Sequence, residues 1–343
     1  MIIPVRDGGE AFRLCLEALS RSSRKPDEII VVDDSSADTS RETALHFGAL
    51  VLDQAGGPFG PAAARNRGAQ AAASDLLVFV DADIAVHADS LAKLEDYANK
   101  NPEIAAFFGS YDDAPSSQST VSLYKNLEHH YVHQHSRQEA GTFWAGIGAI
   151  RKEPFLRVGG FDEGYNRPSI EDIQLGIRLK QAGYRIWLCA DVQGKHLKRW
   201  SFMSMLRSDI ADRAVPWTRL ILSSAKIPSD LNLNLASRLS ALLAWIFVIS
   251  LFAGLEKSLL WTVSALSIVL LILLNINLYR LFHQRGSWIF VIGAFGLHLF
   301  YFLYSSFLFG LLTLEYLVRN GLSLQNDGRH RVSVKRGTSD DRG

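Results

Sequence analysis

The sequence predicts an α/β domain with a mainly parallel sheet covered by helices on both faces, followed by a region of transmembrane helices. Short apolar runs alternate with segments of helical periodicity within residues 1–198. The apolar runs are almost continuous, as in parallel strands that are buried on both faces. Residues 239–318 are then overwhelmingly apolar, which is typical of helices that cross a membrane.

Strand and helix signals follow one another in regular order from the first residue. We expect strands at residues 2–5, 28–34, 49–53 and 75–83. We expect helices at residues 11–22, 37–48, 61–73 and 89–100. Gly48 ends the second of these helices, and Pro61 lies in the first turn of the third. This alternation predicts parallel strands joined by crossover helices.

Charged side chains follow the strands at the edge of the sheet where parallel strands end. Arg6 follows the first strand, Asp33 and Asp34 end the second, and Asp81 and Asp83 end the fourth. In open α/β sheets the ligand lies beyond these strand ends. Two neighbouring carboxylates repel each other unless a cation joins them, and oxygen ligands suit Mg²⁺ or Mn²⁺ carrying a diphosphate. Neither a GxGxxG motif nor a GK[ST] loop is present, so a metal is expected to hold the phosphates.

Five segments in the soluble half of the chain together resemble the family 2 glycosyltransferases of the GT-A fold. They occur in this order: IIPVRDGG, EIIVVDDSSADTS, GPAAARNRGAQAAASDLLVFVDADI, GAIRKEPFLRVGGFDEGY and IEDIQLGIRLKQAGYRI. The resemblance implies an inverting enzyme that transfers a sugar from a UDP- or GDP-sugar with the help of Mg²⁺ or Mn²⁺. Its domain would occupy residues 1–198.

The resemblance also implies roles on the donor side of the site. Pro4, Arg6, Asp33 and Asp34 match segments that line the nucleoside pocket, with Asp33 the usual contact to the base or ribose. Arg65 matches a basic position near the donor. A surface position for Arg65 remains an equal alternative, and the two aspartates could instead cap the following helix.

Further roles concern the metal and the chemistry. Asp81 and Asp83 match the DxD pair, in which the first acid touches the ribose or sugar and the second touches the metal. His196 is a candidate third metal ligand or phosphate contact, although a structural role is the more common one for a lone histidine. Glu171 and Asp172 match an acidic pair that opens a helix, with Asp172 the catalytic base. Acids in a first helical turn are also favoured by the helix dipole alone.

Two further features border the expected site. The histidines of residues 129–135 include His129 and His133 at i, i+4 spacing, but without an HExxH motif we favour a solvated helix face over a metal site. Trp144 is expected either to border the acceptor region or to pack in the core. Cys15 and Cys189 belong to no CxxC pair and are expected to be buried thiols.

The second half of the chain is expected to lie on and in a membrane. Residues 199–235 have a basic and an apolar face, which predicts interfacial helices, although core-packing helices are an alternative. Residues 236–318 contain three uncharged stretches, 239–255, 259–279 and 288–314, which predict about three transmembrane helices. Residues 319–343 form a basic tail that we expect to be flexible. The side of the membrane on which this tail lies remains open, because its charge conflicts with the positive-inside rule.

These features together predict a multi-pass protein of the inner cell membrane with a cytoplasmic catalytic domain. We expect one sugar to be moved from a nucleotide-sugar to a lipid or lipid-linked acceptor. A processive polysaccharide synthase is the alternative, although the QxxRW segment of such enzymes is matched only in part. A catalytically silent scaffold is a further alternative. The formal net charge of +1 gives no support for nucleic acid as a partner.

Overall fold

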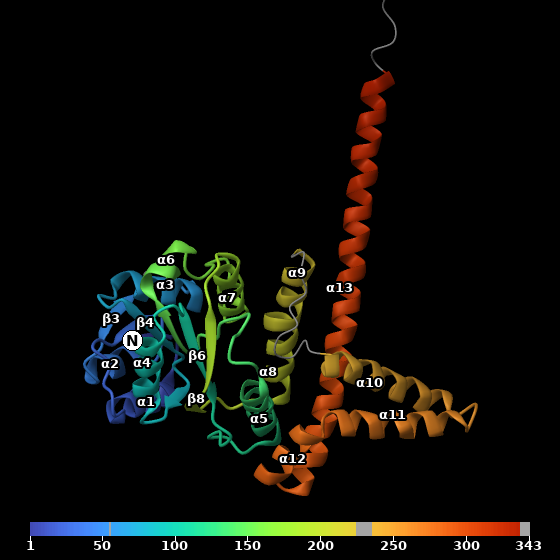
Figure 1. Ribbon diagram of the computed structural model, residues 1–343, viewed down its shortest axis with the longest axis horizontal. Coiled ribbons are helices and arrows are strands. Elements are labelled where there is room, and N and C mark those ends of the chain that lie inside the picture. Colours follow the sequence, from blue (N-terminus) through green and yellow to red (C-terminus); the bar gives the residue numbers. More distant parts are fainter. Residues whose placement is uncertain (55, 224–234, 337–343) are drawn as a thin grey trace, which may run out of the picture.

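The computed structural model describes residues 1–54, 56–223 and 235–336, with side chains described as far as Arg319. Its amino-terminal half is built on an eight-stranded sheet of order β3-β2-β1-β4-β7-β6-β8-β5 (Figure 1). The strands are β1 (Ile2–Val5), β2 (Ile30–Asp33), β3 (Leu50–Asp53), β4 (Leu76–Val80), β5 (Ile84–Val86), β6 (Ala106–Tyr111), β7 (Ile147–Arg151) and β8 (Ile186–His196).

The sheet is mixed but mainly parallel, which confirms the predicted fold class. β1 pairs in parallel with β2 and β4, and β2 pairs in parallel with β3. β7 runs antiparallel to both β4 and β6, and β5 runs antiparallel to β8. The strand predicted at residues 75–83 ends early, because the chain turns between β4 and β5, and this turn carries Asp81 and Asp83.

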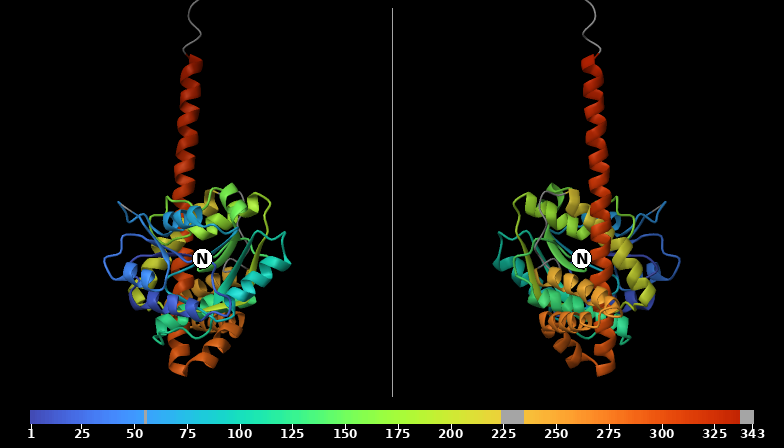
Figure 2. Two further views of the ribbon diagram at one scale, coloured as in Figure 1. Left: turned by 90° about the vertical axis from the view of Figure 1, so that its left-hand side faces the viewer. Right: turned by 90° about the vertical axis from the view of Figure 1, so that its right-hand side faces the viewer.

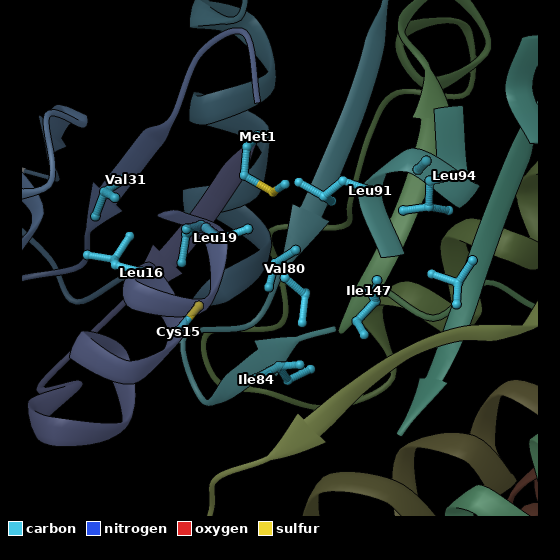
Figure 3. Close-up of a cluster of buried hydrophobic side chains, with 14 of the residues drawn as sticks. Met1, Cys15, Leu16, Leu19, Val31, Val80, Ile84, Leu91, Leu94 and Ile147 are labelled. Atoms are coloured by element: carbon cyan, nitrogen blue, oxygen red, sulfur yellow. The ribbon is translucent and has the colours of Figure 1, made fainter. Parts of the chain in front are cut away.

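Helices cover both faces of the sheet. They are α1 (Gly9–Arg21), α2 (Ser40–His46), α3 (Pro61–Ala71), α4 (Ser90–Lys100), α5 (Thr120–His135), α6 (Lys152–Arg157) and α7 (Glu171–Gln181). One buried cluster joins α1, α2 and α4 to the sheet, and Figure 3 shows Cys15, Leu16 and Leu19 of α1 among its side chains. A second cluster joins α3, α6 and α7 to the opposite face. These two apolar layers hold the strand ends in place.

Helix α3 approaches the sheet closely because its inner face consists of small residues. Ala62, Ala64 and Ala69 are fully buried there. A Cβ atom added at Gly68 would lie 2.5 Å from Cγ2 of Ile2, so only glycine fits at this contact. The close approach brings Arg65 of α3 to the turn that follows β4.

The carboxy-terminal half is helical. Its elements are α8 (Phe202–Arg207), the π-helix η1 (Ser208–Ala214), α9 (Val215–Ser223), α10 (Leu235–Ala253), α11 (Leu260–Leu274), α12 (Ile276–Arg285) and α13 (Trp288–Arg336). α10 and α11 lie side by side, and α13 extends away from the rest of the protein (Figures 1 and 2). Among the described residues, two helical segments are long and apolar enough to cross a membrane, Leu235–Ala253 and Trp288–Arg319.

The predicted stretch 259–279 is broken rather than straight. The axes of α11 and α12 differ by 71° at Asn275, so together they form either one broken span or a re-entrant loop. The Asn275 side-chain amide donates to the Ser240 hydroxyl at 2.8 Å and to the Leu271 carbonyl at 2.9 Å. An amide that satisfies a backbone carbonyl in this way allows the helix to bend. The described protein therefore has two candidate spans, or three if the bent pair is counted.

Two of the predicted segments extend beyond the described residues. Residues 224–234, at the end of the predicted interfacial region, lie outside them, as do residues 337–343 of the predicted tail. Within the described part of that tail, α13 continues as helix to Arg336.

The helical half is joined to the sheet domain through α5 and η1. An apolar cluster packs Tyr124 and Leu127 of α5 against Phe282 of α12 and Phe290 of α13. A second junction is polar and lies at Asp209 of η1.

Asp209 connects three helices within this polar junction. Its Oδ1 is 3.0 Å from Nζ of Lys125 on α5, and its Oδ2 accepts a 2.8 Å hydrogen bond from the Tyr304 hydroxyl on α13. Asp209 is buried and only 11% of the Lys125 side chain is exposed, so the charges compensate each other away from water. The junction fixes η1 to α5 and α13.

Candidate active site

Arg65 lies at the centre of the polar cluster beyond the strand ends. Its Nη2 donates to Oδ1 of Asp81 at 2.6 Å and its Nη1 donates to Oε1 of Glu171 at 2.9 Å. Its guanidinium carbon also lies 5.4 Å from the centre of the Phe161 ring. Burial acts to lower the pKa of Arg65, but the carboxylates of Asp81, Glu171 and Asp172 outweigh it and raise the pKa. Arg65 is 5% exposed, so the surface alternative is wrong.

Asp81 and Asp83 lie in the tight turn between β4 and β5. The Asp81 carbonyl accepts the Ile84 N–H at 3.1 Å, which closes the turn and directs both acids beyond the sheet. Asp81 forms a direct ion pair with Arg65, whereas Asp83 has only the longer-range attraction of Lys198 and Arg65. Burial, followed by repulsion from Asp81, raises the pKa of Asp83 to about 6. An under-compensated carboxylate of this kind favours a nearby cation.

His196 ends β8 beside Asp83. Its Nε2 is 3.9 Å from Oδ2 of Asp83, and its ring stacks on Tyr111 with centroids 4.2 Å apart. Burial, together with the nearby charges of Lys198 and Arg213, lowers the pKa of His196 to about 3. The imidazole is therefore neutral at physiological pH, which is the form that binds metals.

Asp83 and His196 fit a divalent cation such as Mn²⁺ or Mg²⁺. They supply one carboxylate and one neutral imidazole, and the carboxylate lacks a full counter-charge. Asp81 is held by Arg65. Within the described ranges, no group of three or more His, Cys, Asp or Glu side chains is arranged to hold a metal ion. Any further ligands would have to come from the bound phosphates or from water.

The aspartates after β2 shape the loops around the site. Asp34 accepts the N–H groups of Phe59 and Gly60, both at 2.8 Å, and so fixes the loop before α3. Asp33 accepts the Ser36 N–H at 3.0 Å. The residue preceding α2 is Thr39, without a side-chain cap, so the alternative that these aspartates cap α2 is wrong.

The loops after β1 and β2 are joined to each other. The Asp7 carboxylate accepts the Ala37 N–H at 2.7 Å, and the Ser36 hydroxyl accepts the Asp7 N–H at 2.9 Å. Asp7 and Ser35 have φ values of 50° and 63°, which is strained for residues other than glycine. Strained loops of this kind are frequent at ligand sites.

Pro4 and Arg6 lie on the same side of the site as these loops. Pro4 lies within β1 opposite Val32. Arg6 is exposed after β1, with its Nε 3.9 Å from Asp7.

Glu171 and Asp172 form the first turn of α7, as the resemblance implies. Oε1 of Glu171 binds Arg65 and its Oε2 accepts the Ser169 N–H at 2.8 Å, so both of its oxygens are engaged. Asp172 accepts the Ile173 N–H at 2.8 Å and the Ala145 N–H at 3.2 Å. Burial, followed by repulsion from Glu171, raises the pKa of Asp172 to about 7. A half-buried carboxylate with this pKa is suited to accept a proton near neutral pH.

The histidines of α5 do not form the solvated face that we favoured. His133 is buried, and its Nδ1 lies 3.1 Å from the Gly109 carbonyl. The rings of His129 and Tyr111 lie 4.5 Å apart, and those of Tyr111 and Trp144 lie 4.9 Å apart. The i, i+4 spacing places both histidines on one face of α5 but does not say which face is buried. In the structure this face packs against β6. The aromatic cluster forms one wall of the site.

Some residues near the site could not be recognised from the sequence. Tyr111 gives no motif signal, yet its ring contacts His129, Trp144 and His196. Ser169 precedes the acidic pair by two positions and binds both Glu171 and the Asp212 carbonyl. A serine two residues before a helical acid is a weak signal of such a turn.

The sequence matches two described protein families. Residues 1–159 match "Glycosyl transferase family 2", and residues 125–199 match "N-terminal domain of galactosyltransferase". The uncharacterized glycosyltransferase YibD of Escherichia coli K12 is 37% identical over 92 residues, which are 25% of this chain and 26% of that protein. The O-antigen chain rhamnosyltransferase WbaN of Salmonella anatum is 24% identical over 232 residues, which are 63% of this chain and 73% of that protein.

The fold has a counterpart among solved structures. The mannosyltransferase PcManGT from Pyrobaculum calidifontis, in complex with GDP-Man and Mn²⁺, superimposes with a TM-score of 0.54 at 17% identity. The superposition covers 87% of this chain and 86% of that chain, and it supports the GT-A fold. The matched segments contain the DxD turn and the strand ends described above. The sheet domain therefore belongs to glycosyl transferase family 2 and has the GT-A fold.

Proposed function

We propose that the protein is a membrane-bound, inverting glycosyltransferase that moves one sugar from a nucleotide-sugar to a lipid or lipid-linked acceptor. The observation that carries this proposal is the single guanidinium of Arg65, which binds both Asp81 of the DxD turn and Glu171 beside Asp172. Arg65 thus connects the DxD turn, which we expect to bind the donor, to the first turn of α7, which we expect to carry the base. A donor held over the turn would then lie next to the proposed base.

The donor would be a UDP- or GDP-sugar lying across the loops after β1, β2 and β4. Asp33 and Arg6 are proposed to contact the nucleoside, and Asp34 would keep the adjoining loop in place. Asp83 and His196 would hold Mg²⁺ or Mn²⁺, with Asp81 nearby to contact the ribose or sugar. The cation, when bound, neutralises charge on the diphosphate leaving group. The related mannosyltransferase that was solved with GDP-Man and Mn²⁺ supports this choice of ligands.

Asp172 is proposed to accept the proton of the acceptor hydroxyl. As the new bond to the anomeric carbon forms on the face opposite the leaving diphosphate, the acceptor oxygen loses its proton to the carboxylate. The Ala145 N–H, 3.2 Å from Oδ2 of Asp172, helps to orient that carboxylate. Glu171, whose two oxygens are engaged, would act as a positioning residue that keeps α7 against Arg65.

The acceptor would arrive from the membrane. Of the candidate spans, α13 is joined to the sheet domain through the Asp209 junction. α8, η1 and α9 lie between the site and these helices. A hydrophobic acceptor could remain in the bilayer while its head group reaches Asp172.

The test is to incubate membranes that contain the protein with a panel of radiolabelled UDP- and GDP-sugars, and then to extract and separate the lipids. We expect one labelled lipid that carries a single added sugar and forms only with added Mn²⁺ or Mg²⁺. A ladder of products would support a processive synthase instead. If no sugar is transferred to any lipid, and label appears only in water-soluble products, the lipid acceptor is excluded.

A further inference from the structure

A cavity of about 520 Å³ lies between the loop that precedes α7 and the interfacial helices. The loop contributes polar and aromatic groups, whereas η1 and α9 contribute mainly apolar ones. Six of the residues that line it are Tyr165, Arg167, Ser169, Val215, Arg219 and Leu220. None of these residues belongs to the donor side of the site described above.

The cavity is attached directly to the turn that carries Asp172. The Ser169 hydroxyl donates to the Asp212 carbonyl of η1 at 2.6 Å, which closes one end of the cavity. The Ser169 N–H donates to Glu171 at 2.8 Å. A ligand in the cavity would therefore lie beside the first turn of α7, and a group that extends from it could reach Asp172.

The charges on the cavity wall favour an anion. Nε of Arg167 lies 2.8 Å from Oδ1 of Asp212, so this arginine is partly neutralised while 49% of its side chain stays exposed. Arg219 is exposed, and within the described ranges it forms no ion pair. Guanidinium groups bind phosphate through paired, charge-assisted hydrogen bonds.

The apolar side of the cavity favours an amphiphile over a free ion. Val215, Pro216 and Leu220 belong to α9 and form this side. The next described helix along the chain is α10, one of the candidate membrane spans. An anionic head with an attached hydrocarbon chain would match both the arginines and this apolar side.

We propose that this cavity binds the phosphate group of a membrane lipid, with Arg219 and Arg167 on the phosphate and α9 along the first part of the hydrocarbon chain. The inference rests on the proposed function in so far as this lipid is the sugar acceptor. It adds to that function the position of the acceptor's phosphate and the chemical class of the head group.

Binding can be measured without catalysis by using Trp217 of α9, the immediate neighbour of Pro216. The full-length protein in detergent is titrated with phosphatidic acid that carries brominated acyl chains, which quench nearby tryptophans. The Trp217→Phe variant, titrated in parallel, isolates the part of the signal that comes from this position. Two comparison ligands are used. Brominated diacylglycerol lacks the phosphate, and inorganic phosphate, which does not quench, is added as a competitor.

We expect saturable quenching of Trp217 by phosphatidic acid and much weaker quenching by diacylglycerol. Arg219→Gln should raise the half-quenching concentration about tenfold, as the loss of one charge-assisted contact implies. Arg219→Lys should recover part of the affinity because it keeps the charge but not the paired geometry. Arg207→Gln, an exposed arginine of α8 outside the cavity, is the matched control and should bind as the unmodified protein does.

Two results would overturn the inference. The first is that Arg219→Gln and Arg167→Gln both bind phosphatidic acid as tightly as the unmodified protein does. Neither arginine would then hold the phosphate. The other is loss of quenching on addition of equimolar inorganic phosphate, which would make the site one for free anions. If the protein transfers sugar to a lipid but either result is obtained, this inference fails while the proposed function stands. If quenching behaves as expected but no lipid is glycosylated, the proposed function fails instead.

Discussion

Arg65 of α3 and Glu171 of α7 form a buried ion pair of 2.9 Å across 106 positions of the sequence. The same guanidinium binds Asp81 at 2.6 Å. In this buried cluster each ionised group has a hydrogen-bonded partner of opposite charge, and removal of the shared arginine leaves both carboxylates without that partner. The pair therefore fixes the distance between the DxD turn and α7.

Arg65→Met should destabilise the protein by about 3–5 kcal/mol, because it leaves Glu171 and Asp81 without their cation. Chemical unfolding, followed by circular dichroism, measures this change. Arg67→Met, on the exposed side of the same helix, is the control and should change stability by no more than about 0.5 kcal/mol. Equal stability of the two variants would show that the ion pair does not hold α3 to α7.

Asp172→Asn should lower the rate of sugar transfer about 10²- to 10⁴-fold, the usual contribution of a general base. The base must be ionised, and the pKa of Asp172 is raised to about 7 by burial and by Glu171. The transfer rate of the unmodified protein should thus rise as the pH increases through about 7 and then level off. If Asp172→Asn has the same pH profile as the unmodified protein, Asp172 is not the base. Asp96→Asn, which changes an exposed aspartate, is the control.

The same pKa shift predicts how Asp172 affects stability. Between its ordinary pKa of 3.8 and the raised value of about 7, the folded state binds more proton than the unfolded state. Stability should therefore fall as the pH rises through this window. Asp172→Asn should remove that contribution and raise the melting temperature at pH values above the window, as measured by differential scanning fluorimetry. A melting temperature lower than that of the unmodified protein at high pH would contradict the assignment.

Asp34→Ala should loosen the loop that precedes α3. It removes the acceptor for the N–H groups of Phe59 and Gly60, and an unsatisfied buried donor costs about 1–3 kcal/mol. We expect faster hydrogen exchange at those two amides and weaker binding of the nucleotide-sugar. Asp75→Ala, an exposed aspartate before β4, should leave both unchanged. Unaltered exchange in Asp34→Ala would show that the loop is held by other contacts.

Lys125→Met should weaken the attachment of η1 to the sheet domain. The change removes the direct ion pair of the buried Asp209 and leaves it only the longer-range attraction of Arg213, so the cost is at most about 3–5 kcal/mol. Hydrogen exchange of residues 208–214 should increase, since η1 is then held by Tyr304 and the Ser169 contact. Lys100→Met, whose side chain is 69% exposed, is the matched control with an effect within about 0.5 kcal/mol. Unchanged exchange in η1 would contradict the role of this junction.

Asp83→Ala should abolish Mn²⁺ binding, and with it most of the affinity for the nucleotide-sugar. His196→Ala should weaken Mn²⁺ binding less, because a carboxylate contributes more charge to the site. Electron paramagnetic resonance of Mn²⁺ with and without the donor measures both effects. Asp53→Ala, a carboxylate at the end of the edge strand β3, should bind Mn²⁺ normally. Retention of Mn²⁺ binding by Asp83→Ala would refute the metal assignment.

The sequence alone determined the elements whose signals are local. The apolar runs placed β1, β2 and β3 correctly to within two residues and β4 to within three, and the long uncharged stretches located α10 and α13. The acidic residues after β2 and β4 could be predicted to lie at one edge of the sheet, because parallel strands end there. The position and type of these elements follow from hydrophobic periodicity and from the order of the segments. Both are properties of short stretches of sequence.

Only the tertiary structure decided which charged side chains form ion pairs and which side chains are buried. It buried Arg65, turned His133 inward and bent the apolar stretch at Asn275. It also brought Ser169 to η1, although 43 positions separate Ser169 from Asp212. A side chain's environment depends on how closely distant helices approach the sheet. That approach is set by contacts such as the one between Gly68 of α3 and Ile2 of β1, which lie far apart in the sequence.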